Sequence, residues 1–145
     1  MKKTIIVLLI LLFAIQFIRP EKNTTGINDN HISNAFVVPD EVKLILKNSC
    51  NDCHSNATIY PWYSEIAPAS WYLAQHVNDG KKHLNFSEWM NYNANQKKHI
   101  INDLEEVLEE QEMPLKSYTL VHETAKLTPF QYQILKDWVA TIKVD

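Results

Sequence analysis

The 145-residue chain contains little glycine, little cysteine and no large excess of charge of either sign. Two glycines and six prolines exclude a collagen-like repeat and a glycine-rich disordered chain. Two cysteines are too few for a disulfide framework or a four-thiolate zinc site. A formal net charge of −3 argues against a nucleic-acid-binding protein, which needs a basic face. The remaining class is a globular protein of one domain, since 46% of the residues are hydrophobic.

The N-terminus carries an apolar run preceded by two lysines. Only Thr4 and Gln16 are polar within residues 4–18, and this order is typical of an export signal, either cleaved or retained. As a helix the run would span about 22 Å, against roughly 30 Å for a hydrocarbon core, so flanking basic side chains would have to reach the interface. The end of the run lacks the A-x-A pattern of small residues that marks a cleavage site. We therefore expect a retained transmembrane anchor over residues 1–20, with the domain on the periplasmic side; the alternative is cleavage to a soluble periplasmic protein.

Beyond this run, the sequence predicts a polar linker and an all-α domain. Residues 21–36 are rich in Asn and Thr, as linkers are, and the domain is expected over residues 37–145. Strand patterns are nearly absent, whereas apolar residues recur at helical spacing. The expected helices begin at residues 38–41, at Pro68, at about residue 94 and at Thr128.

The ends of these helices follow from local signals. The first is expected to run up to Cys50, the second to end at Gly80 and the third at about Gln111. In the last helix Thr128 is the expected N-cap, with proline at the first helical position. Its predicted buried stripe comprises Phe130, Ile134, Leu135, Trp138, Val139 and Ile142.

The residues that can carry chemistry are concentrated in the sequence Cys50-Asn51-Asp52-Cys53-His54. In an exported protein, Cys-x-x-Cys-His is the attachment sequence for c-type haem. Two thiols three residues apart can each add to one vinyl group on the same edge of a porphyrin. The next residue then places an imidazole beneath the iron. We therefore expect Cys50 and Cys53 to carry the thioethers of one haem c, and His54 to be the proximal iron ligand.

Other interpretations of the two cysteines have to be compared with this one. A zinc site would need a second pair of ligands at similar spacing, which the chain does not have. A thioredoxin-like redox pair would follow a strand in a βαβ unit, and no such unit is indicated. A disulfide between Cys50 and Cys53 would close a small, strained ring. The redox pair and the disulfide remain as alternatives to haem attachment.

Met113 is the candidate for the sixth iron ligand. Its thioether is a soft ligand, Pro114 restrains the loop that presents it, and His–Met ligation raises the reduction potential as electron transfer requires. The alternatives are that Met113 only fills a gap in the core, that the sixth position is open, or that a histidine occupies it. The candidate histidines are His76, His83, His99 and His122.

With these motifs the chain resembles the haem-binding domain family of bacterial cytochrome c-like proteins. The resemblance covers roughly residues 37–142 and implies a cytochrome c-like helical fold in which the first and last helices pack together. It also implies that Cys50 and Cys53 carry the thioethers, that His54 is proximal and that Met113 is distal. The residues that carry it are 50–56, 60–64, 66–68, 70–71, 83–89, 113–114, Tyr118, His122, 125–127 and the final helix with Trp138.

The segment after the motif is rich in aromatic residues. We expect Tyr60, Trp62 and Trp71 to enclose the haem, because a porphyrin needs a large apolar surround; a docking surface is the alternative. Polar side chains near its end are expected to hold this segment through hydrogen bonds. They are His83, Asn85, Ser87 and Glu88.

The predicted function is single-electron transfer by a membrane-attached monohaem cytochrome, with one or more redox partner proteins and no nucleic acid. The alternative is a haem-based sensor or a peroxidase-like enzyme whose sixth position opens. Peroxide chemistry usually needs an arginine or an acid beside a distal histidine. The sequence has no arginine besides Arg19, which favours the electron carrier over the enzyme.

Overall fold

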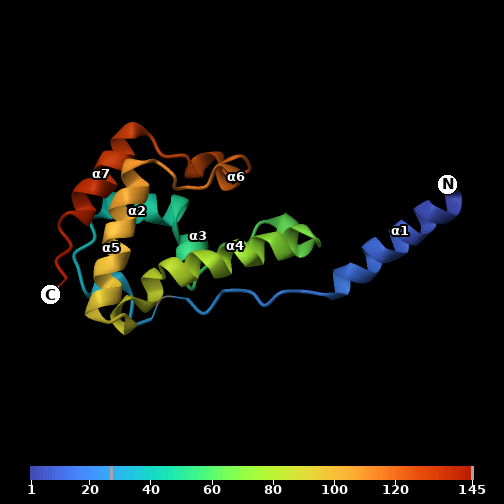
Figure 1. Ribbon diagram of the computed structural model, residues 1–145, viewed down its shortest axis with the longest axis horizontal. Coiled ribbons are helices and arrows are strands. Elements are labelled where there is room, and N and C mark those ends of the chain that lie inside the picture. Colours follow the sequence, from blue (N-terminus) through green and yellow to red (C-terminus); the bar gives the residue numbers. More distant parts are fainter. Residues whose placement is uncertain (27, 145) are drawn as a thin grey trace.

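Helices make up all the regular secondary structure of residues 1–26 and 28–144, which are the residues that the computed structural model describes (Figure 1). The predicted all-α class is therefore confirmed. Among these residues no strand occurs. In chain order the elements are α1 (Lys2–Ala14), η1 (Ile15–Phe17), η2 (Ile32–Asn34), α2 (Asp40–Ser49), α3 (Asn51–His54), η3 (Trp62–Glu65), α4 (Ala69–His83), η4 (Phe86–Asn91), α5 (Ala94–Glu109), α6 (Lys116–Thr119), η5 (Glu123–Ala125) and α7 (Pro129–Val139).

The hydrophobic core lies where α7 packs against both α5 and α2, at the end of the molecule opposite α1 in Figure 1. The expected contact between the first and last helices of the domain is present as the α2–α7 contact. Each helix contributes one apolar face. The buried side chains from the three helices and the turn after α7 are Val42, Ile45, Leu46, Ile100, Leu108, Leu135, Trp138, Val139 and Ile142.

The start of α7 agrees with the sequence prediction. The Thr128 hydroxyl accepts a hydrogen bond from the Gln131 backbone N–H, and the Gln131 side chain accepts one from the Thr128 N–H. Pro129 occupies the first helical position, where its missing N–H costs nothing. One residue of the expected stripe is placed wrongly: Phe130 is 70% exposed, because it lies in the first turn, before the helix reaches the core.

The two middle helices differ from their expected lengths. Helix α5 begins with a capping box at Asn93 and ends at Glu109, two residues earlier than predicted, and Gln111 adopts a left-handed φ of 55°. Helix α4 continues through Gly80 to His83, so the prediction that Gly80 ends it is wrong. The reason is tertiary, because Gly80 is the point at which α4 touches the Cys-x-x-Cys-His turn.

Helix α1 projects from the domain (Figure 1). None of its residues is buried. Its 13 residues correspond to about 20 Å of helix, short of the roughly 30 Å of a hydrocarbon core. Within residues 1–26 and 28–144, no helix combines the length and the apolar character needed to cross a membrane. The predicted transmembrane anchor is therefore not supported.

The segment expected to be a linker runs along the domain surface and bonds to it at several points. Thr58 N–H donates to the Asn23 carbonyl at 3.0 Å, and Gly26 N–H donates to the Asn56 carbonyl at 2.8 Å. Further along, Met90 N–H donates to the Asn30 carbonyl. Asn23, Gly26 and Asn30 thereby lie against the part of the chain that comes after the Cys-x-x-Cys-His motif.

Candidate functional site

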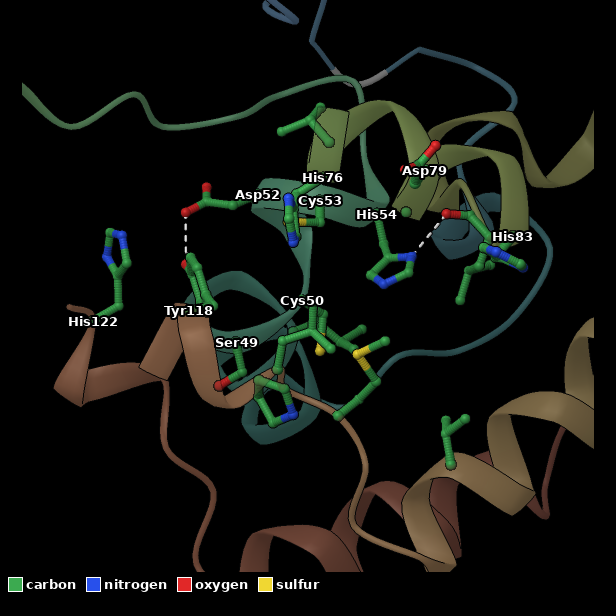
Figure 2. A pocket seen from close by; sticks show the side chains of 18 of the residues that line it. Ser49, Cys50, Asp52, Cys53, His54, His76, Asp79, His83, Tyr118 and His122 are labelled. Atoms are coloured by element: carbon green, nitrogen blue, oxygen red, sulfur yellow. Dashed lines mark hydrogen bonds between the residues drawn. The ribbon is translucent and has the colours of Figure 1, made fainter. Parts of the chain in front are cut away.

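A largely apolar cavity of about 860 Å³ lies at the centre of the helical domain. The sequence motif forms part of its wall through Cys50, Cys53 and His54 (Figure 2). Cofactor pockets in proteins have volumes of roughly 300–1,000 Å³, so this one is large enough for a porphyrin-sized group. Apolar side chains from α2, α4, α5, α7 and the segments between them complete the wall, among them Leu46, Val77, Phe86, Leu104 and Leu135.

The motif forms a tight helical turn directly after α2. The backbone N–H groups of Cys53 and His54 both donate to the Cys50 carbonyl, at 3.1 Å and 2.9 Å. This turn brings both thiols and the imidazole to one side of the cavity, as Figure 2 shows. Both cysteines are free thiols, so the disulfide interpretation is not what the structure contains.

Burial keeps both thiols protonated. It raises the pKa of Cys50 to about 12 and that of Cys53 to about 11, with the neighbouring thiol and Asp52 adding to the respective shifts. A reactive redox pair of the thioredoxin kind has the opposite property, a thiol pKa lowered by helix dipoles or cationic neighbours. The environment of Cys50 and Cys53 therefore does not support the redox interpretation.

The orientation of His54 is set by a backbone carbonyl. Its Nδ1 lies 3.0 Å from the Leu84 oxygen. Because a carbonyl can only accept, Nδ1 carries the proton and Nε2 keeps a free lone pair. Burial also lowers the pKa of His54, which favours the neutral ring. A neutral imidazole held through one nitrogen, with the other one free, is the usual arrangement of a metal-binding histidine.

Gly80 allows α4 to approach the motif turn. A Cβ atom at this position would lie 2.6 Å from the Cys53 carbonyl oxygen and 3.0 Å from the Cys53 Cβ. The first distance is shorter than real Cβ contacts and the second is very tight, so a larger residue would require the backbone of α4 or of the motif turn to shift. The sequence analysis missed this role, because a glycine near the end of a periodic segment is also the usual signal for a helix end.

A polar cluster extends from the motif along one wall of the cavity. Asp52 accepts hydrogen bonds from the Ile59 backbone N–H at 2.9 Å and from the Tyr118 hydroxyl at 2.7 Å, the second drawn in Figure 2. The Tyr118 ring stacks on His122 at 4.4 Å between centroids. His122 Nε2 in turn lies 2.7 Å from the Tyr63 hydroxyl. Sequence analysis missed this cluster, since 66 residues separate Asp52 from Tyr118 and no local pattern joins them.

The segment after the motif is held by buried hydrogen bonds, as expected for three of the four polar residues. The Ser87 hydroxyl accepts from the Asn56 N–H at 3.0 Å, and the Asn85 side chain donates to that of Asn56 at 2.9 Å. Glu88 accepts from the Asn56 amide group at 2.7 Å. The fourth residue, His83, lines the cavity instead.

Comparison with known proteins assigns this arrangement to a family. The profile of a family described as haem-binding domain matches residues 10–141, which is most of the chain. The chain belongs to the haem-binding domain family. No curated protein and no solved structure matches it.

The residues of this haem-binding domain fit the group that the family binds. The cavity has the size and the apolar wall that a porphyrin needs, two free thiols reach it, and His54 presents an unprotonated ring nitrogen. Met113, the predicted distal ligand, lines the same cavity. Its backbone carbonyl accepts a hydrogen bond from the Tyr132 hydroxyl at 2.9 Å, which ties the loop of Met113 to α7.

The four candidate histidines of the haem-binding domain have other environments. His99 is an exposed residue of α5 beside an aspartate and does not line the cavity. His122 lines the cavity, but its Nε2 is already bonded to Tyr63. His76 and His83 also line it, both from α4, the helix that packs against the turn of the proximal candidate.

The three aromatic residues expected to enclose the haem lie outside the cavity. Trp62 is 78% exposed, the Tyr60 hydroxyl accepts from the Asn23 N–H at 2.7 Å, and Trp71 donates to the Ile18 carbonyl at 2.8 Å. The predicted role of Tyr60, Trp62 and Trp71 is therefore corrected. The sequence pattern could not distinguish them from true wall residues, because contacts with the distant N-terminal segment hold Tyr60 and Trp71.

Proposed function

We propose that this haem-binding domain holds one haem c through thioether bonds to Cys50 and Cys53. Each thiol would add across one vinyl group, forming a carbon–sulfur bond and placing its hydrogen on the other vinyl carbon. The addition is redox-neutral and needs no oxidant. The observation that carries this proposal is that two free thiols and His54 share one wall of an apolar cavity of porphyrin size.

We further propose that His54 and Met113 are the two axial ligands. His54 has its Nδ1 proton bound by the Leu84 carbonyl and its Nε2 free, and Met113 lies on the wall contributed by the loop between α5 and α6. A thioether and an imidazole together favour the reduced iron and raise the potential. An iron held by both residues would suit electron transfer better than binding of an external ligand.

The proposed activity is transfer of single electrons to and from a redox partner protein. Haem, when bound, supplies the one-electron couple of its iron. The chain contributes the apolar wall, which excludes water and limits reorganisation when the charge of the site changes. It offers no arginine beyond Arg19 to assist cleavage of a peroxide bond, so the peroxidase-like alternative has less support.

We propose that the domain lies on the periplasmic side and that α1 attaches it to the membrane. Retention of the N-terminal segment is supported by the family match, which begins at residue 10, inside the apolar run. It is also supported by contacts of Gln16, Ile18 and Arg19 with residues of the domain. A reporter fused to the C-terminus, active only outside the cytoplasm, tests the topology; an inactive reporter would contradict it.

The covalent bond is tested by expression with a c-type maturation system and extraction in acidic acetone. The wild-type protein should keep its haem, whereas a variant with both Cys50→Ala and Cys53→Ala should release it or fail to acquire it. Haem that is extracted from the wild type would show non-covalent binding and refute the thioether assignment while leaving haem binding intact.

The sixth ligand is tested by replacing Met113 with alanine. The oxidised wild type should show the weak far-red absorption band of sulfur bound to ferric iron, and the reduced form should exclude carbon monoxide. Met113→Ala should lose the band, bind carbon monoxide and have a lower potential. Met90→Leu is the control, because Met90 is 48% exposed and does not line the cavity. A wild type that binds carbon monoxide would favour the sensor or enzyme alternative.

A further inference from the structure

The apolar surface of α1 has no cover within residues 1–26 and 28–144. Its side chains from Ile5 to Phe13 are each at least half exposed, and none is buried. A helix that is apolar on all sides is stable only inside a protein core or in lipid. The domain does not supply that core, since its hydrogen bonds to the N-terminal segment begin at Gln16, after the end of α1. Lipid is the occupant that fits this surface.

The chain that leaves α1 is bound to the domain at its first residues. The Gln16 side chain makes two hydrogen bonds to one residue, accepting from the Ala67 N–H at 2.9 Å and donating to the Ala67 carbonyl at 3.1 Å. Two residues later, the Ile18 carbonyl accepts from the Trp71 indole N–H at 2.8 Å. A paired amide contact restricts direction as well as distance, so α1 leaves the domain at a defined angle.

Ion pairs also join the segment after α1 to the domain. Glu65 forms ion pairs with both Arg19, at 3.1 Å, and Lys22. All three side chains are at least partly exposed, so each pair alone contributes little. Together with the bonds of Gln16 and Ile18, they attach residues 16–22 to a single region of the domain, residues 65–71.

Exposed apolar side chains lie within residues 65–71 and in η3, directly before them. Trp62 in η3 is 78% exposed and Ile66, the residue after η3, is 47% exposed. Figure 1 shows the N-terminal end of α4, next to η3, pointing towards the side from which α1 leaves. We call Trp62 and Ile66 the apolar tip. Tryptophan is enriched at membrane–water interfaces, where its ring lies among headgroups and its N–H stays near water.

We infer that residues 16–22 act as a rigid mount rather than a flexible tether, and that the apolar tip rests on the lipid surface into which α1 inserts. This inference rests on the proposed membrane attachment. It adds a fixed orientation of the domain. Pro61 and Tyr63, on either side of Trp62 in the chain, line the central cavity, so the bound cofactor would be held close to the membrane surface.

The orientation can be measured on the full chain, matured with haem and reconstituted into oriented bilayers of phosphatidylethanolamine and phosphatidylglycerol. Linear dichroism of the main haem absorption band should show a preferred angle of the porphyrin plane. A variant with Gln16→Ala, Arg19→Ala and Lys22→Ala should stay in the bilayer, keep its absorption spectrum and lose the dichroism. The matched control, Lys43→Ala with Lys82→Ala, removes two exposed ion pairs elsewhere and should keep it.

Hydroxyl-radical footprinting gives a second readout that does not depend on haem. In vesicles Trp62 should be protected in the wild type and oxidised in the triple variant, whereas the exposed Phe130 should be oxidised equally in both. An isotropic wild type with unprotected Trp62 that still sediments with vesicles would overturn the rigid mount and leave membrane attachment standing. Recovery of the chain in the supernatant would refute the attachment as well, and a dimer that covers α1 would replace lipid by a second copy.

Discussion

Gly80 shows how one residue sets the distance between the helix α4 and the turn formed by the Cys-x-x-Cys-His motif. Glycine in the middle of a helix costs about 1 kcal/mol relative to alanine, so its presence in α4 needs a compensating contact. That contact is the approach of Gly80 to the Cys53 backbone, which leaves no space for a Cβ atom. The same approach brings Leu84, one turn further on, to the position where its carbonyl binds His54.

Replacing Gly80 by alanine tests this explanation. Helix propensity alone would raise the free energy of unfolding by about 1 kcal/mol. We expect instead a decrease of about 1–3 kcal/mol, because the added methyl group collides with backbone atoms that cannot rotate away. Denaturant unfolding measures the difference. Asn78→Ala, an exposed position of the same helix, should not lower stability, and a stabilised Gly80→Ala protein would contradict the close approach.

Like the Gly80 contact, the hydrogen bond from the Tyr118 hydroxyl to Asp52 holds the Cys-x-x-Cys-His turn through a single residue. Burial and then the neighbouring Asp52 carboxylate raise the pKa of Tyr118, so its hydroxyl remains a donor throughout the physiological range. Asp52 lies between Cys50 and Cys53 in the chain, and its second oxygen accepts from the Ile59 N–H. The Tyr118 hydroxyl therefore holds Asp52 in place, and with it the turn formed by the Cys-x-x-Cys-His motif.

Tyr118→Phe should lower the free energy of unfolding by about 1.5–3 kcal/mol, the range for a hydrogen bond to a charged group. The ring and its stacking on His122 are kept, so the change isolates the hydroxyl. Tyr72→Phe, at a tyrosine that is 57% exposed, is the control and should change stability little. Equal stability of the two variants would show that the bond to Asp52 contributes nothing.

At the scale of elements, the N-terminal segment depends on one carboxylate that joins two cations. A hydrogen bond from Lys22, with the charges of Lys22 and then Arg19, lowers the pKa of Glu65 below its ordinary value near 4.5. A carboxylate whose pKa is depressed in the folded state stabilises that state above the ordinary pKa. The stabilisation disappears as the pH falls through the lowered value. The contact between residues 16–22 and η3 should therefore be most stable at neutral pH and less stable in acid.

Hydrogen exchange of the Ala67 amide, which donates to Gln16, reports this contact. After correction for intrinsic exchange rates, its protection should fall as the pH is lowered through the range below about 4.5, where Glu65 gains a proton. In Glu65→Gln the protection should be somewhat lower than in the wild type at neutral pH and should change less with acid. The Cys50 amide, bonded within α2, is an internal reference. Equal pH dependence in wild type and variant would exclude Glu65 as the cause.

At the scale of the whole molecule, the cavity separates two groups of packed helices. Helices α5 and α7 pack against each other on one side, and α3 packs against α4 on the other, with about 860 Å³ between the groups. A haem bound there would give the lining atoms of both groups packing partners. A haem held there would thus be part of the core of this domain, and its removal should affect all helices together.

Chain made without haem attachment should be much less stable than the haem-loaded protein. We expect helical far-ultraviolet dichroism to persist, near-ultraviolet dichroism to weaken and an apolar dye to bind, since the secondary structure outlasts the packing. The loaded protein gains stability because haem binds only the folded chain. A haem-free chain that unfolds at the same denaturant concentration as the loaded one would show that the cavity closes on its own.

Features that depend on neighbours along the chain could be predicted from the amino-acid sequence alone. The spacing of Cys50, Cys53 and His54 predicts their shared turn, because residues three and four apart lie on one face of a helix. Thr128 and the proline after it predict the start of α7 through local capping. The apolar periodicity predicts the all-helical class, although it also assigned Phe130 to the core, where burial depends on what the first turn meets.

Features that join distant segments depended on the tertiary structure. The packing turned Gly80 from an expected helix end into a contact with Cys53, bonded Tyr118 to Asp52, and moved Trp62 from the expected haem enclosure to the surface. The physical reason is that side-chain type limits which contacts are possible, whereas the packing of α4 on the motif and of the N-terminal segment on η3 selects among them. Such pairings cross tens of residues, and no pattern within one helix records them.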